Sequence, residues 1–181
     1  MSLMIVTFIL TTILILPEKL YARDHAVHRQ GPPPTRIHTA VAKKSIKYEP
    51  SNRKLKFTPW VSIEVENNKR IIKSNGVPNH LVGRFPNCGN PHTIEEQSHS
   101  FSVPLKPTIK RGAYSLTSGW AFGVAINGIP FEPLAAEWYL GKRNSYWRYE
   151  ALSGAIALGP DTNHAHVQPG GKYHYHGVPI G

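Results

Sequence analysis

Histidines gather near the end of this sequence, in two His-x-His pairs on either side of a Pro-Gly-Gly turn. Four of the ten histidines, at positions 164, 166, 174 and 176, lie within thirteen residues. Side chains alternate along a strand, so each pair places two imidazoles on one face. A turn between the two strands can bring the pairs together. We therefore predict a hairpin that forms either a metal site or a cluster of general acids and bases.

The length of the turn decides whether the two pairs share a face. In a three-residue loop over 169–171, Gln168 pairs with Lys172, and His166 lies opposite His174. The last glycine of the loop then occupies the position that takes a left-handed conformation. A two-residue loop shifts the register by one and sends the pairs to opposite faces. With the longer loop, the tyrosines of the second strand point to the packed face.

Facing imidazoles suit Zn or Cu, because neutral histidine is a common ligand of both metals. Three ligands with an open position are typical of catalytic sites, and four in a closed tetrahedron are typical of structural ones. His80, in a tight loop, is a candidate ligand from a distance. Asp161 and Glu150 are candidate proton acceptors, and Asp161 could instead bind the metal or orient an imidazole. The alternative is a set of strand histidines bonded only to backbone and neighbours.

The remaining pattern predicts a mainly β, loop-rich domain with a small antiparallel sheet, sandwich-like or irregular. Alternation over 60–66 predicts a half-buried strand, which the turn at 67–68 joins to a strand over 70–73 as a hairpin. Further short strands are expected over 100–104, 120–126 and 129–131, and a short helix over 134–140.

The first 59 residues are expected to be a leader and a flexible arm. Residues 3–16 carry no charge and precede Leu20-Tyr21-Ala22, a pattern typical of a signal peptide over 1–22. We expect a secreted protein, periplasmic or extracellular, with no stable membrane span after cleavage. Residues 23–59 then form a basic, proline-containing flexible segment before a domain over 60–181.

The net charge of +10 lies mainly at the front of the chain, since residues 23–73 hold twelve Lys and Arg against four acids. Such a segment suits an anionic surface polymer or glycan, whereas no nucleic acid is expected. Trp120, Trp138 and Trp147 are candidates for a sugar-stacking surface. These features support an alternative function as a non-catalytic extracellular binding module. Cys88 is the single cysteine, so no internal disulfide is possible.

The chain resembles the YHYH-domain proteins, named for the run that stands here as Tyr173-His174-Tyr175-His176. Matching blocks run in order to the end of the chain, at 74–80, 83–87, 89–91, 101–104, 123–131, 136–137, 149–154 and the closing histidine segment. The resemblance implies an exported protein.

The resemblance also selects among the candidate residues. The site positions it implies are His80, Glu150, His166, His174 and His176. Similar sequences often have asparagine at the position of His164, which makes that residue an optional ligand. YHYH domains continue beyond this point, so the resemblance implies that 60–181 is the N-terminal part of a domain, incomplete at its C-terminus. We expect a histidine cluster that binds Zn or Cu.

Overall fold

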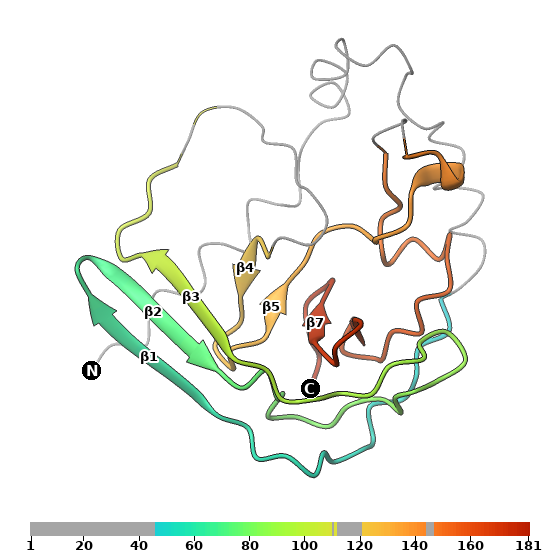
Figure 1. Ribbon diagram of the computed structural model, residues 1–181, viewed down its shortest axis with the longest axis horizontal. Coiled ribbons are helices and arrows are strands. Elements are labelled where there is room, and N and C mark those ends of the chain that lie inside the picture. Colours follow the sequence, from blue (N-terminus) through green and yellow to red (C-terminus); the bar gives the residue numbers. More distant parts are fainter. Residues whose placement is uncertain (1–45, 110, 112–120, 144–146) are drawn as a thin grey trace. The chain divides into compact units, whose positions relative to one another are not determined.

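The computed structural model describes residues 46–109, 111, 121–143 and 147–181, all within the compact unit Arg36–Gly181. The expected leader and most of the basic arm lie outside the described residues. Within them, the unit is mainly β and loop-rich, as predicted, with short strands in two sheets (Figure 1). None of the helices among these residues is long and apolar enough to cross a membrane.

The first sheet has three antiparallel strands in the order β1-β2-β3, with bounds Val61–Glu66, Lys69–Ser74 and His99–Pro104. Asn67 and Asn68 join β1 to β2 with φ of 48° and 60°, the left-handed conformations that a two-residue hairpin turn needs. The predicted hairpin is confirmed. The expected half-burial of β1 is wrong, because Ile63 and Val65 remain 50% and 62% exposed.

The second sheet holds the histidine hairpin. Its strands are β4 (Gly123–Val124), β5 (Pro130–Phe131), β6 (Ala165–Val167) and β7 (Tyr173–Tyr175), in the order β4-β5-β7-β6. β7 runs parallel to β5 and antiparallel to β6, so it has a hydrogen-bonded neighbour on each side. Hydrogen bonds on both sides therefore hold β7, the strand that carries the Tyr-His-Tyr run, in place.

The region of the expected helix contains only the 3-10 turn η2, Tyr139–Gly141. Leu134 and Leu140 have φ of 59° and 51°, and these left-handed conformations interrupt any right-handed helix over 134–140. Of the run, Ala135 is buried, whereas Leu140 is 60% exposed.

Residues 46–59 differ from the flexible segment expected up to residue 59, because they follow the surface of the unit with regular backbone contacts. The Glu49 N–H donates to the Pro160 carbonyl at 2.9 Å. Arg53 and Val82 exchange two backbone hydrogen bonds, each of 2.9 Å. Backbone pairing of this kind needs no apolar side chains.

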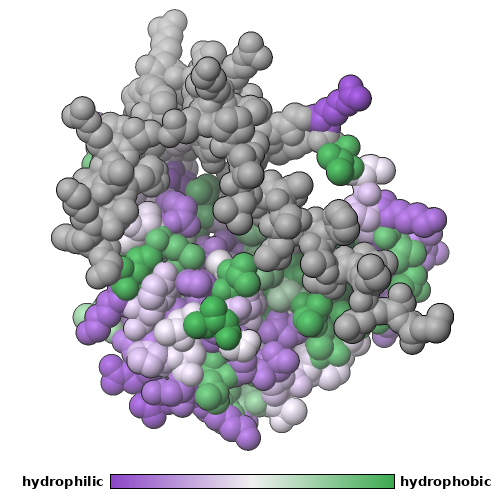
Figure 2. All heavy atoms as spheres, turned by 180° about the vertical axis from the view of Figure 1, so that it is seen from behind, coloured by the Kyte–Doolittle hydropathy of each residue, from purple (hydrophilic) through white to green (hydrophobic). Residues whose placement is uncertain are grey.

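The core forms around the tyrosine face of β7. Tyr173 and Tyr175 are fully buried and pack with apolar neighbours from four other segments, namely Val82, Ile94, Ile129, Ala165 and Val167. The prediction that the tyrosines take the packed face is confirmed. Elsewhere, Figure 2 shows hydrophobic side chains of the described residues in patches among hydrophilic ones.

We predict that Gly171→Ala destabilises the protein by about 2–4 kcal/mol in urea unfolding. Gly171 has φ of 80°, and an added Cβ would lie 2.5 Å from the Glu95 Cβ. Gly170→Ala is the matched control, because its φ is 83° but no atom lies within 4 Å of the added Cβ. Equal losses in the two variants would show that contact with Glu95 does not matter.

Candidate metal centre

The loop of the β6–β7 hairpin has the three-residue length on which the site depends. The Gln168 N–H donates to Lys172 at 2.9 Å, and the register places His166 opposite His174. Gly170 and Gly171 both have positive φ. Of the two loop lengths considered from the sequence, the three-residue loop is present, and Gly171 has the left-handed conformation expected for it.

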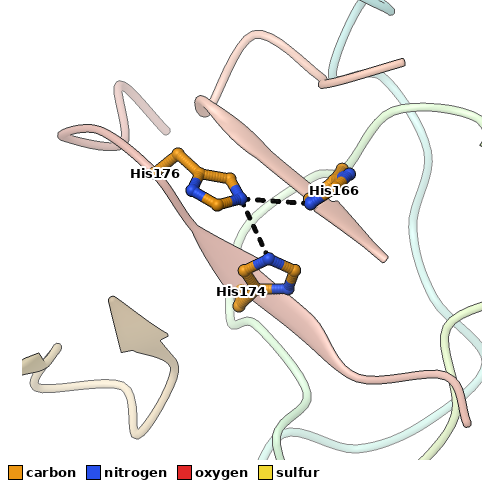
Figure 3. A group of neighbouring side chains, drawn as sticks. All are labelled: His166, His174 and His176. Atoms are coloured by element: carbon orange, nitrogen blue, oxygen red, sulfur yellow. Dashed lines mark hydrogen bonds between the residues drawn. The ribbon is translucent and has the colours of Figure 1, made fainter. Parts of the chain in front are cut away.

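Three histidines meet on the face of the hairpin opposite the tyrosines (Figure 3). The Nε2 atom of His176 lies 3.0 Å from that of His174 and 3.1 Å from that of His166. A ligand nitrogen of each histidine lies within 4.8 Å of the others, with His174 buried and the other two half-buried. The ring centroids are 4.6–4.9 Å apart, so the three imidazoles are in mutual contact.

Backbone carbonyls set the tautomers of two of these rings. His174 Nδ1 lies 3.3 Å from the Lys172 carbonyl, and His166 Nδ1 lies 3.2 Å from the Leu158 carbonyl. A carbonyl accepts only, so each Nδ1 carries the proton and each Nε2 keeps its lone pair toward the centre. Metal-ligating histidines in proteins commonly donate their other ring N–H to a carbonyl in the same way.

Asn90 supports His166 from behind. Its buried side-chain amide donates to the Val167 carbonyl at 2.9 Å and to the Leu158 carbonyl at 3.3 Å. The same nitrogen lies 3.3 Å from His166 Nδ1, so it contacts the ring directly as well. Asn90 therefore fixes the carbonyl that orients His166. The sequence analysis placed Asn90 in a matching block but assigned it no role, because its partners are 68 and 77 residues away.

Burial keeps the three imidazoles neutral. Desolvation, followed by the nearby His166, lowers the pKa of His176 to about 3. Burial lowers the pKa of His174 well below its usual range, with His166 and His176 adding to the effect. The pKa of His166 is also lowered by burial, against opposing effects of the Leu158 carbonyl and of Glu137 and Glu132. Neutral rings are the form that binds metal.

A buried carboxylate lies beside the triad on the histidine face. Glu132 pairs with Lys172 at 2.5 Å and accepts a hydrogen bond from Gln168, the two residues of the rung below His166 and His174. Sequence analysis missed Glu132. The only local sign in the sequence was a single acidic residue directly after the apolar strand β5. Its partner Lys172 lies 40 residues away, so no local sequence pattern links the two.

His164 and His80 are apart from the triad. His164 has φ of 57°, which breaks the strand alternation, and its Nδ1 lies 2.8 Å from the Val178 carbonyl. His80 lies on the tyrosine side, where its Nε2 is 2.6 Å from the Tyr175 hydroxyl. The structure therefore brings together three of the five predicted ligands.

The two predicted proton acceptors also lie away from the triad. Asp161 is fully buried and accepts hydrogen bonds from the Tyr173 hydroxyl at 2.7 Å and the Gly83 N–H at 3.0 Å, on the tyrosine side. Glu150 raises the pKa of Tyr48, after the larger effect of burial, and its carbonyl accepts from Ser153. Of the predicted tryptophans, Trp120 lies outside the described residues, and the Arg148 guanidinium covers one face of Trp138.

Comparison with known families gives one match. Residues 100–181 match the family described as YHYH protein, which confirms the resemblance over those residues. No curated protein and no solved structure matches the chain. The triad, Glu132 and the whole β6–β7 hairpin lie inside the matched residues, whereas His80 and Asn90 precede them.

We predict that the free energy of unfolding of metal-free protein falls as the pH drops from about 6.5 toward 3. The folded pKa values are depressed, so the unfolded chain binds more protons in this window and acid favours unfolding. Each such histidine contributes a slope of about 1.4 kcal/mol per pH unit. Urea unfolding at several pH values measures this slope. If His176→Gln leaves the slope unchanged, His176 is not buried in the neutral form.

Proposed function

We propose that the YHYH-family segment over residues 100–181 binds one divalent transition-metal ion, Zn or Cu, through the Nε2 atoms of His166, His174 and His176. The observation that carries this proposal is the convergence of three Nε2 atoms, with contacts of 3.0 and 3.1 Å from that of His176 to the other two. The family match covers the residues of the triad, but its description gives no activity.

The spacing of the nitrogens fits such an ion. Zn–N bonds of about 2.1 Å in a tetrahedral site place ligand nitrogens about 3.4 Å apart. The two short Nε2 contacts fall a few tenths of an ångström below this value. A small outward rotation of the rings would complete the geometry.

The protonation states also favour a cation. With Nδ1 protonated in His166 and His174, both of their Nε2 atoms present lone pairs to His176. One Nε2–H of His176 can serve only one of these two contacts well. A cation accepts all three lone pairs together. His176 Nδ1 is buried without a hydrogen bond of ordinary geometry to a described group, so no such bond fixes the tautomer of this ring.

Three protein ligands leave a coordination position for water or substrate, where a bound metal supplies Lewis-acid or redox chemistry. Two described carboxylates act on the pKa of His166, namely Glu137 and, with a smaller effect, Glu132. Glu132 is the buried one of the two, and it is held by Lys172 on the histidine face. Its pairing with Lys172 and Gln168 holds the hairpin in register below the triad. Glu150 and Asp161 would need to reach the metal from other faces.

We also propose that the protein is exported. The uncharged run over 3–16 followed by Leu20-Tyr21-Ala22 supports a cleaved leader, as does the resemblance to exported YHYH proteins. A histidine-only site suits this setting, since it has no thiol ligand to oxidise.

We predict that chelator-treated full-length protein takes up about one equivalent of Zn²⁺ and that His174→Ala plus His176→Ala abolishes uptake. Elemental analysis after desalting measures the stoichiometry, and Co²⁺ substitution reports the ligand geometry by its visible absorption. His80→Ala and His164→Ala are matched controls that retain the metal, because neither ring reaches the triad.

Two results would contradict the proposal. Metal below about 0.1 equivalent in wild-type protein would exclude the site. Equal loss of metal in the His80→Ala control would show that the ligand set is different from the triad.

A further inference from the structure

A groove of about 430 Å³ lies apart from the histidine triad, between the segments 53–57, 82–85 and 93–95. Its floor is apolar and part of the core, since Val82 and Ile94 are buried against the tyrosine face. Leu55, Phe57 and Phe85 are half-buried side chains along its walls. These apolar side chains stay partly accessible instead of closing over the floor.

The walls of the groove are held by the backbone. Arg53 and Val82 are joined by two hydrogen bonds of 2.9 Å, and the Glu95 N–H donates to the Gly171 carbonyl at 3.0 Å. Phe85 packs edge-on against Tyr173, with ring centroids 6.1 Å apart. The groove is therefore preformed, which lowers the entropic cost of binding a ligand.

The rim of the groove is cationic. Arg53, Lys54, Lys56 and Arg84 are exposed, and Glu95 is the only acid among the lining residues. Within the described residues, none of the four cations forms an ion pair. The Lys56 ammonium lies over the Phe57 ring, 4.8 Å from its centroid, and so covers part of an apolar side chain of the groove.

The charge of the groove selects among occupants. Residues 23–45 hold five Lys and Arg against one Asp, and a second copy of the chain carries a net charge of +10. Both would be repelled by a cationic rim. A ligand with repeated negative charges and apolar faces complements the rim and the floor together.

We propose that this groove binds an acidic polysaccharide of the polyuronate class. The carboxylates would pair with Arg53 and Arg84, whose guanidinium groups can bind a carboxylate in bidentate fashion. The apolar faces of the sugar rings would pack on Phe85, and on Phe57 once Lys56 turns from that ring toward a carboxylate. An extended peptide fits less well, because the backbone groups of Arg53 and Val82 that could extend a strand already pair with each other.

The test measures binding of polygalacturonate to full-length protein by calorimetry at low and moderate salt. We expect Arg53→Ala plus Arg84→Ala to weaken binding at least about tenfold, and wild-type binding to weaken as salt rises. Lys69→Ala plus Lys73→Ala is the matched control with the same loss of charge on exposed positions of β2, and it should change affinity less than about twofold. Phe57→Ser should weaken binding without changing the salt dependence.

Three outcomes would overturn the proposal. Equal weakening of polygalacturonate binding in the two double variants would show that only the net charge of the protein matters, and not the groove. Tighter binding of poly-glutamate than of polygalacturonate would assign the groove to an acidic peptide. No binding by wild-type protein at low salt would remove the site. Thermal unfolding of each variant checks that the fold is kept.

Discussion

The structure depends on the register of the β6–β7 hairpin. The loop over 169–171 makes His166 face His174, and one residue fewer would turn one histidine pair toward the core. The same register sends Tyr173 and Tyr175 into that core, where they are fully buried. One turn thus decides both what the domain packs around and what it presents on the opposite face. Gly171 holds the turn against Glu95, and Glu132 holds the rung beside it.

The two faces of β7 use polar groups differently. On one face, the Tyr173 hydroxyl donates to Asp161, and the Tyr175 hydroxyl meets His80 and Asn127, so buried oxygen atoms are satisfied by specific partners. On the other face, three imidazoles are left with each other as partners at Nε2. The first arrangement is what a core requires of polar tips. The second places three ring nitrogens together without another partner among the described residues, and the proposed metal site is based on this arrangement.

Local sequence patterns predicted much of this fold. Most of what they missed depends on residues that are far apart in the sequence. Alternation and turn residues were sufficient for the β1–β2 hairpin, because neighbours in sequence decide it. For β6 and β7 the sequence indicated a hairpin but left two loop lengths open, and the structure has the three-residue one. The roles of Asn90 and Glu132 depend on partners 36–77 residues away, which no local pattern encodes. His164 was misplaced for a local reason, since its left-handed φ ends the alternation one residue before β6 begins. The expectation of a flexible segment up to residue 59 rested on composition, and composition carries no information on the backbone hydrogen bonds that residues 46–59 form.

All three triad histidines lie within eleven consecutive residues, 166–176, on one hairpin. Closing so short a loop costs little chain entropy, and hairpins form within microseconds. A metal ion could therefore meet its complete ligand set in a chain whose other elements are still unpaired. Binding there would hold β6 against β7 before the long-range contacts to Glu132, Asn90 and the core are made. The proposed ion would then act as a folding nucleus as well as a cofactor. In that case the hairpin would bind its metal before the rest of the chain collapses around it.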